Sequence, residues 1–413
     1  QIAFYGIFAI LGNVLNSRGS FGAFGWAPVA NNVVAIAGQV VFLVLWGRQD
    51  DPAAWSPAMV WTLAGSATLG IIVQCLVLVP ALRRTGFHWR PRWGLRGQGF
   101  GAIGRFSMWT FAALCVAQGG GLVVMSVTTG LAPPTAPGAS ASAQPFVPEY
   151  VAYQKALVLF QVVPSLIAVS ILTALFPQLA RAWQANSLRG TREIVRQGLV
   201  LPAVGMIPAS VAMVALAGPL VSTIYFTLSP DQSRGTELIL AVMALSTLFY
   251  GIAGWQQQYC FASEQGRVNL GMQLLLTLIQ VAFALTALVV PAHLGVLTVA
   301  VGQVVGNLVV SVVFLAFAQH QLGELRLGGV VWLYARLGLG SLVPGGVAWG
   351  VARLITGWNS LWLGQFLGCL AGAAAFGVVF LMMARVLQIS EFFDLLQPLL
   401  RRLHPAQRLQ PAR

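Results

Sequence analysis

Charged side chains are scarce in this chain, and acidic ones are the scarcest. Only 8% of its 413 residues are charged, with 10 aspartates and glutamates against 23 lysines and arginines. A soluble domain carries about 25% charged residues, so the composition argues against a water-soluble protein. The net charge of +13 does not indicate a nucleic-acid partner. The basic residues lie in short loops beside apolar stretches, where they orient a membrane protein and attract anionic lipid at its inner surface.

Motifs for catalysis and metal binding are also missing. The sequence contains no HExxH, P-loop or GxSxG motif. Its cysteines lie singly within apolar stretches and form no CxxC pair, so neither a zinc site nor a disulfide is indicated. We therefore expect no enzyme, no metal site and no cofactor. The four cysteines are Cys75, Cys115, Cys260 and Cys369.

Eleven apolar stretches fill the chain instead. About 20 apolar residues cross the hydrocarbon core as a helix, and backbone amides in lipid must be satisfied within the segment, which favours helices over strands. The predicted fold is therefore all-α, a polytopic membrane protein with about eleven transmembrane helices. The stretches are 1–16, 26–47, 56–82, 103–130, 150–180, 197–226, 236–262, 268–291, 293–318, 329–355 and 360–385.

Arginines crowd into every second loop between these stretches, and the alternate loops hold Asp50, Asp51 and Asp231 or no charge. Arginine-rich loops stay in the cytoplasm, so the sequence predicts a cytoplasmic C-terminus and a first stretch that enters from outside. We expect an odd number of spans upstream of Gln1. The arginines that set this orientation include Arg83, Arg84, Arg90, Arg92, Arg96, Arg181, Arg189, Arg192, Arg267, Arg326, Arg401, Arg402, Arg408 and Arg413.

Two segments do not resemble spans. Residues 131–148 are rich in proline, alanine and serine and carry no charge, which indicates a flexible external loop. Residues 389–413 combine apolar and arginine side chains. They are predicted either as a basic amphipathic helix on the inner membrane surface or as a simple basic anchor.

Polar residues inside spans are the candidate substrate contacts, because burying them in lipid is costly. Lys155, the single lysine, lies between Gln154 and Gln161, and the two glutamines are seven residues apart on nearly one helix face. This face could bind an anionic head group in an aqueous cavity, or Lys155 could extend to the outer interface. Gln118 either faces a cavity or bonds a neighbouring helix.

Further amides lie in the later spans. Gln256, Gln257 and Gln258 are consecutive, and Gln303 and Asn307 are four residues apart on one stripe. We interpret both groups mainly as bonds between helices.

The segment GNVLNSRGSFGAFGWAPVANNVVAIAG, Gly12 to Gly38, resembles the fourth and fifth helices of the MurJ/MviN lipid II flippases. Asn16, Arg18, Pro28 and Asn31 match the family's pattern there. The segment from Tyr153 to Ala182 resembles the eighth helix, whose closing L-P-x-L is represented by Pro177.

The resemblance implies a two-lobed fold of the multidrug/oligosaccharidyl-lipid/polysaccharide exporter superfamily, with the first three of fourteen helices missing. It implies a flippase, expected as a monomer in the bacterial plasma membrane, that moves the undecaprenyl-linked peptidoglycan precursor outward by alternating access. Coupling to the membrane potential or to a monovalent ion stays open. The resemblance also implies a division of the chain. Residues 1–130 form the rest of the N-terminal lobe and the first helix of the C-terminal lobe, and 131–148 form the external loop. Residues 149–318 form the C-terminal lobe helices, 319–388 the last two helices with a lipid-tail groove, and 389–413 the basic tail.

The chain departs from the family pattern in the stretch at 150–180. The family's eighth helix carries an arginine and, three residues later, a glutamate, but alignment on Pro177 places Val158 and Gln161 there. Lys155, one turn earlier, is a candidate substitute. The alternatives are a flippase for another polyprenyl-linked glycan, a cation-coupled antiporter and an inactive membrane scaffold. Carboxylates are absent from the span centres, which weakens the antiporter alternative.

Overall fold

The computed structural model describes residues 1–18, 20–49, 54–86, 100–131, 150–358 and 361–387. Every regular element within these residues is a helix, and the predicted all-α fold is confirmed. Apart from Leu131, the predicted loop at 131–148 lies outside the described residues, as does the predicted tail at 389–413. The chain divides into two compact units, unit 1 over Gln1–Gln98 and unit 2 over Gly99–Arg413.

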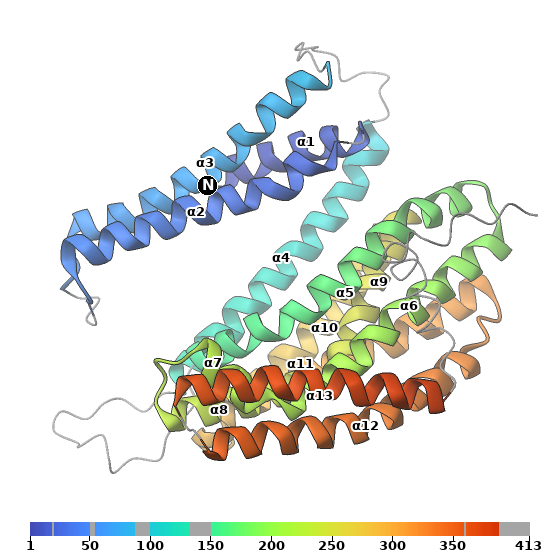
Figure 1. Cartoon of the computed structure of the whole chain (residues 1–413). Coiled ribbons are helices and arrows are strands. Elements are labelled where there is room, and N and C mark those ends of the chain that lie inside the picture. Colours follow the sequence, from blue (N-terminus) through green and yellow to red (C-terminus); the bar gives the residue numbers. More distant parts are fainter. Residues whose placement is uncertain (19, 50–53, 87–99, 132–149, 359–360, 388–413) are drawn as a thin grey trace, which may run out of the picture. The chain divides into compact units, whose positions relative to one another are not determined.

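Unit 1 contains α1 (Ile2–Ser17), α2 (Phe21–Trp46) and α3 (Pro57–Arg84). Helices α2 and α3 lie side by side (Figure 1). Gly70 of α3 packs directly against Asn31 of α2. The thiol of Cys75 donates to the carbonyl oxygen of Phe4 at 3.1 Å and so joins α3 to α1. Small and polar residues therefore let these helices approach closely, as is common in membranes.

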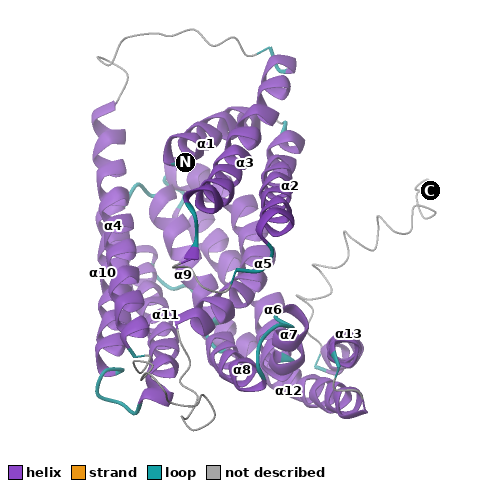
Figure 2. Ribbon diagram, turned by 90° about the vertical axis from the view of Figure 1, so that its left-hand side faces the viewer, coloured by secondary structure: helices purple, strands orange, loops and turns teal. Residues whose placement is uncertain are grey.

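Unit 2 contains ten helices among its described residues, and α4, α10 and α11 run together on one side of it (Figure 2). Helix α6 lies between α5 and α12, and α13 packs mainly on α12. The helices are α4 (Phe100–Gly130), α5 (Tyr150–Gln184), α6 (Leu188–Ala215), α7 (Ala217–Ile224), α8 (Pro230–Ala244), α9 (Thr247–Ala262), α10 (Gly266–Thr286), α11 (Ala292–Leu322), α12 (Leu327–Trp358) and α13 (Trp362–Val386).

Each of the eleven predicted stretches contains a helix. In the described part of the chain, nine helices are long and apolar enough to cross a membrane, and the bent pair α8–α9 would make a tenth. Helix α1 has 16 residues, fewer than the roughly 20 that a span needs. The number of helices that cross the membrane, and the three helices expected upstream, stay predictions.

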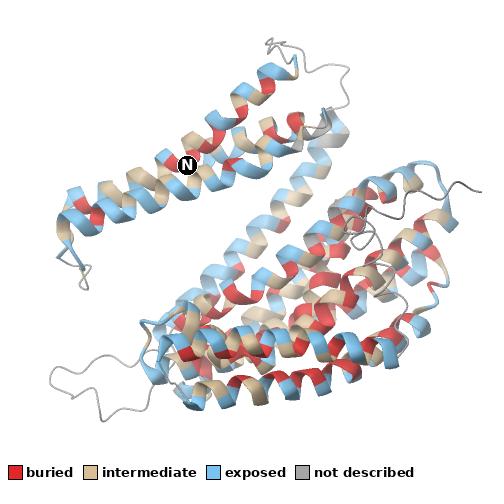
Figure 3. Cartoon of the chain, viewed as in Figure 1, coloured by how far each residue is buried: buried red, intermediate tan, exposed pale blue. Residues whose placement is uncertain are grey.

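The largest fully buried side chains of unit 2 are aromatic, among them Trp255, Tyr259 and Phe160, whereas many leucines and valines are exposed. Figure 3 shows that buried and exposed residues alternate along its helices. Trp255 of α9 is fully buried against Gly198 of α6, and its indole N–H donates to the carbonyl oxygen of Val195 at 3.2 Å. An apolar outer surface suits lipid as the surrounding solvent.

The predicted span at 236–262 coincides with two helices, α8 and α9, which together are apolar enough to cross a membrane and are bent by 54° at the break between them. The hydroxyls of Ser246 and Thr247 donate to the carbonyl oxygens of Met243 and Ala244 at 2.8 and 2.6 Å. Ser210 of α6 also donates to Ala244. Such side-chain bonds compete with the helical backbone ladder, which explains the bend.

The predicted span at 197–226 also differs from the structure. Helix α6 begins earlier, at Leu188, where the hydroxyl of Ser187 accepts a hydrogen bond from the N–H of Gly190. It ends at Ala215, and the short helix α7 follows. Pro202 and Pro208 lie inside α6 without ending it, because neighbouring groups in a membrane bundle can satisfy the freed backbone.

Helices α12 and α13 meet along a seam of small residues. Gly364, Gly368 and Gly372 recur at every fourth position of α13 and are buried. A methyl group on Gly372 would lie 3.0 Å from the carbonyl oxygen of Ala348 and 2.6 Å from Leu216. The two backbones therefore lie too close for side chains between them, the usual arrangement of small-residue interfaces in membranes.

We expect Gly372→Ala to lower the melting temperature of the purified protein, because overpacking a close interface costs about 1–3 kcal/mol. Gly377→Ala, on the same helix, is the matched control, since a methyl group there meets nothing within 4 Å. A fluorescence size-exclusion thermostability assay would measure both. An equal melting temperature for both variants would contradict the close seam.

Candidate functional site

A stripe of polar side chains runs along α10. Asn269, Gln273, Thr277 and Gln280 share one face of this helix. Gln280 donates to the side-chain oxygen of Gln303 on α11 at 2.8 Å, and Gln273 donates to Thr277 at 3.2 Å. The stripe therefore consists of neutral amides and a hydroxyl, and the amides of Gln280 and Gln303 link α10 to α11.

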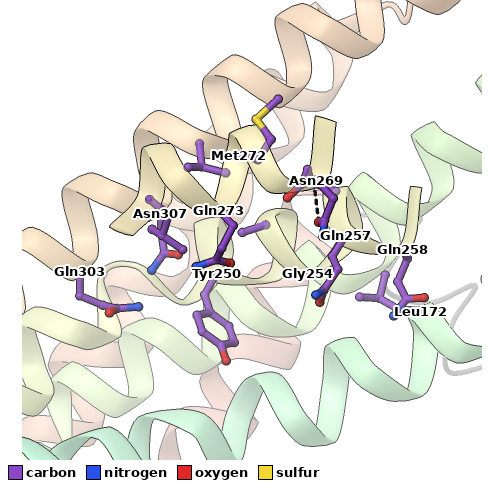
Figure 4. A pocket seen from close by; sticks show the side chains of 14 residues that line it. Leu172, Tyr250, Gly254, Gln257, Gln258, Asn269, Met272, Gln273, Gln303 and Asn307 are labelled. Carbon is purple, nitrogen blue, oxygen red and sulfur yellow. Dashed lines mark hydrogen bonds between the residues drawn. The ribbon is translucent and has the colours of Figure 1, made fainter. Parts of the chain in front are cut away.

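A cavity of about 360 Å³ lies beside this stripe, between α5, α9, α10 and α11. We call it the amide cavity, because carboxamides dominate its polar lining. Figure 4 shows the side chains of Gln257, Asn269, Gln273, Gln303 and Asn307 around it. The polar residues that line it are Tyr250, Gln256, Gln257, Gln258, Asn269, Gln273, Gln303 and Asn307.

Hydrogen bonding in the amide cavity is incomplete. Gln256 donates to Asn269 at 3.4 Å and to the sulfur of Cys260 at 3.2 Å. Asn307 is 1% exposed, yet its side-chain nitrogen has no partner among the described residues. A buried donor without a partner costs about 1–3 kcal/mol, and a polar cavity of this size can hold water that would satisfy it.

Two further cavities adjoin the start of α10. One, of about 560 Å³, is lined by residues of α4, α9 and α10 and shares Gln257, Asn269 and Gln273 with the amide cavity. The other has about 650 Å³ and is lined by Arg105, Glu264 and Arg267 together with polar and aromatic residues. We call this last one the arginine pocket. No group of histidine, cysteine or acidic residues in the described chain could hold a metal ion.

Lys155 lies at the start of α5, and none of the described cavities includes it. Its Nζ lies 5.6 Å from the centre of the Tyr225 ring, and the Tyr225 hydroxyl donates to the Lys155 carbonyl oxygen at 3.1 Å. Gln154 donates to the hydroxyl of Tyr150. Tyrosine side chains thus lie beside both Lys155 and Gln154 at the start of α5. The face of an aromatic ring attracts an ammonium group such as that of Lys155.

Gln161 and Gln118 are exposed on α5 and α4, and neither lines a described cavity. The structure joins Gln154 and Lys155 at one helix end but does not gather all four predicted contacts around a cavity. Their assignment to the substrate stays a prediction.

The described family-motif residues lie within helices or join helix ends, and none of them lines a described cavity. Arg18 donates to the Thr85 carbonyl oxygen at 2.5 Å, which joins the ends of α1 and α3. Pro28 lies inside α2, and the carbonyl oxygen of Pro177 accepts from Arg181 within α5. Asn31 packs on Gly70, while the side chain of Asn16 is outside the described part.

Sequence reasoning missed the polar stripe on α10. It interpreted Gln256 to Gln258, Gln303 and Asn307 as bonds between helices, and it did not connect them with Gln273 and Gln280. The signal was present, because polar residues four apart within an apolar helix share a face. The partner helices could not be identified from spacing alone.

The chain matches the family model described as "Lipid II flippase MurJ" over residues 1–366. It is 25% identical to "Probable lipid II flippase MurJ" of Haemophilus influenzae over 244 residues, which cover 58% of this chain and 42% of that protein. The match therefore spans less than half the length of the curated relative.

The fold is similar to that of a solved structure, "Lipid II flippase MurJ, inward closed conformation". The TM-score is 0.61 at 16% identity, covering 93% of this chain and 72% of the other. The family is one of transporters and not of enzymes, as the sequence predicts. With the match over residues 1–366, the chain belongs to the MurJ family of lipid II flippases.

Proposed function

We propose that this chain moves lipid II, the undecaprenyl-linked peptidoglycan precursor, from the inner to the outer leaflet of the bacterial plasma membrane. The observation that carries the proposal is the family match over residues 1–366. The similar fold and the neutral, polar interior of unit 2 support it. A lipid-linked glycan needs hydrogen-bonding groups along its head-group path, and its tail can stay in lipid.

In this proposal the protein works as a monomer by alternating access, with its C-terminus in the cytoplasm. Helices α12 and α13 provide a groove for the polyprenyl tail. Leu363, Leu367 and Leu370 of α13 are exposed and apolar, which suits a hydrocarbon chain. Coupling to the membrane potential or to a monovalent ion would supply the driving force.

The head group would contact Lys155, with Gln154, Gln161 and Gln118 as hydrogen-bonding neighbours. The single lysine supports this role, since an ammonium at the edge of a span is available to a pyrophosphate. The Tyr225 ring beside it would hold the cation in place without neutralising it.

Complementation tests the function. We expect the gene for this chain, expressed with any sequence upstream of Gln1, to restore growth of a bacterium depleted of its own lipid II flippase. Failure despite verified membrane insertion would favour a flippase for another polyprenyl-linked glycan, a cation-coupled antiporter or an inactive scaffold. Rescue would exclude the scaffold.

We expect Lys155→Ala to reduce lipid II transport about tenfold or more, because a hydrogen bond to a charged group contributes about 1.5–3 kcal/mol. Gln161→Ala should reduce it less. Gln178→Ala is the matched control, since Gln178 is exposed on the same helix and bonds only within it. Growth rescue and lipid II exposed at the outer surface are the readouts. Unchanged transport in Lys155→Ala would remove this residue from the head-group path.

The amide cavity allows a second test of the proposed transport by alternating access. An interior with a cavity can rearrange between two conformations, so filling the cavity should stabilise one of them and slow transport. We expect Asn307→Leu to raise the melting temperature, since it removes an unpaired buried donor and fills space. Transport should fall in the same variant.

Gln280→Leu is the comparison, since it breaks the bond to Gln303 and should lower the melting temperature. Full transport by a stabilised Asn307→Leu variant would show that the cavity has no part in the conformational change. A melting temperature that falls in Asn307→Leu would contradict the absence of a partner for Asn307.

A further inference from the structure

The arginine pocket lies apart from the amide cavity, where α4 and α10 begin and α11 ends. Arg105 and Arg267 reach it, and Glu264 is the carboxylate among its described lining residues. Two arginines against one glutamate leave an excess of one positive charge. The pocket is lined by unit 2 alone, so its geometry does not depend on how the two units are placed.

Neither arginine has an acidic partner among the residues that the structure describes. Arg267 instead lies over the Trp109 indole, with its guanidinium carbon 5.2 Å from the ring centre. Both arginines are exposed. Stacking on an aromatic ring orients a guanidinium and leaves its N–H groups free, which suits bidentate binding of a phosphate.

Hydroxyl-binding groups lie in the same pocket. The side-chain oxygen of Gln321 accepts from the Tyr259 hydroxyl at 2.9 Å, and Tyr259 is fully buried. This bond fixes the Gln321 amide, whose nitrogen has no partner in the described chain. The Glu264 carboxylate is exposed in the adjacent turn. A carboxylate and a fixed amide together can accept from and donate to a polyol.

Aromatic side chains line the pocket as well, and Phe106 and Phe317 are among them beside Trp109. Indole rings favour the boundary between head groups and hydrocarbon. The pocket also lies at the arginine-rich end of unit 2, which the positive-inside rule assigns to the cytoplasm. Arginines at this end include Arg105, Arg181, Arg189, Arg192, Arg196, Arg267 and Arg326.

We infer that the arginine pocket binds the head group of an anionic, hydroxyl-bearing phospholipid of the inner leaflet, phosphatidylglycerol. Arg105 and Arg267 bind the phosphodiester. Glu264 and Gln321 bind the glycerol hydroxyls, and Phe106 and Phe317 contact the upper acyl chains. This site concerns a structural lipid and does not rest on lipid II transport.

Lipid binding to the purified full chain tests the inference without a transport assay. Native mass spectrometry in neutral detergent would compare short-chain phosphatidylglycerol with phosphatidylcholine of the same chain length, with inorganic phosphate as a competitor. We expect preferential binding of phosphatidylglycerol. We expect Arg105→Gln and Arg267→Gln each to weaken it about tenfold, the size of one lost charge-assisted hydrogen bond.

Arg326→Gln is the matched control, because Arg326 is exposed at the same end but does not line the pocket. It should change binding less than twofold. Arg267→Lys keeps the charge without the planar fork and should weaken binding severalfold, so it tests the site even if Arg267→Gln fails to fold.

Three results would overturn the inference. An equal loss in Arg326→Gln would mean diffuse attraction to basic loops. Displacement of the lipid by equimolar inorganic phosphate would mean a free-phosphate site. Equal binding of phosphatidylcholine would mean that neither the charge nor the hydroxyls of the head group are recognised.

Discussion

A hydrogen-bonding group buried in a membrane bundle has little access to water, so its main partners are other groups of the protein, often on a neighbouring helix. That constraint organises unit 2 around α6. Trp255 of α9 donates to Val195, and Tyr334 of α12 donates to Leu199 one turn further along. Arg192, at the start of α6, donates to the last carbonyl oxygen of α11, that of Leu322. Three helices thus take their positions from donors and acceptors on a single neighbour.

Where the constraint is met only in part, the structure becomes loosely packed and polar. Gln256 bonds Asn269 and Gln280 bonds Gln303, whereas the side-chain nitrogen of Asn307 has no partner among the described residues. A cavity lined by neutral amides can change its hydrogen bonds without moving a charge through lipid, whereas a buried carboxylate could not. This neutrality distinguishes the interior of unit 2 from its ends, where the arginines gather.

The sequence was a good guide to the helices, because long apolar runs have one solution in lipid. It was a poor guide to their breaks. The bend between α8 and α9 depends on Ser246 and Thr247, whose hydroxyls bond backward, and on Ser210 from another helix. The contact of Lys155 with Tyr225 joins residues far apart in the chain. Periodicity identifies a polar face, but only the packing of helices shows what that face meets.

The glycine seam has a mechanical consequence. Gly368 and Gly372 meet the backbone of α12 at Ala352 and Ala348, so a shift of α13 by one residue would drive larger side chains into carbonyl oxygens. Sliding between the two helices is thereby blocked. Helix α13 also contacts α7, and Trp362 donates to the Thr223 carbonyl oxygen. The pair should therefore behave as a stiff lever that transmits a tilt of α6 and α7 to the surrounding lipid.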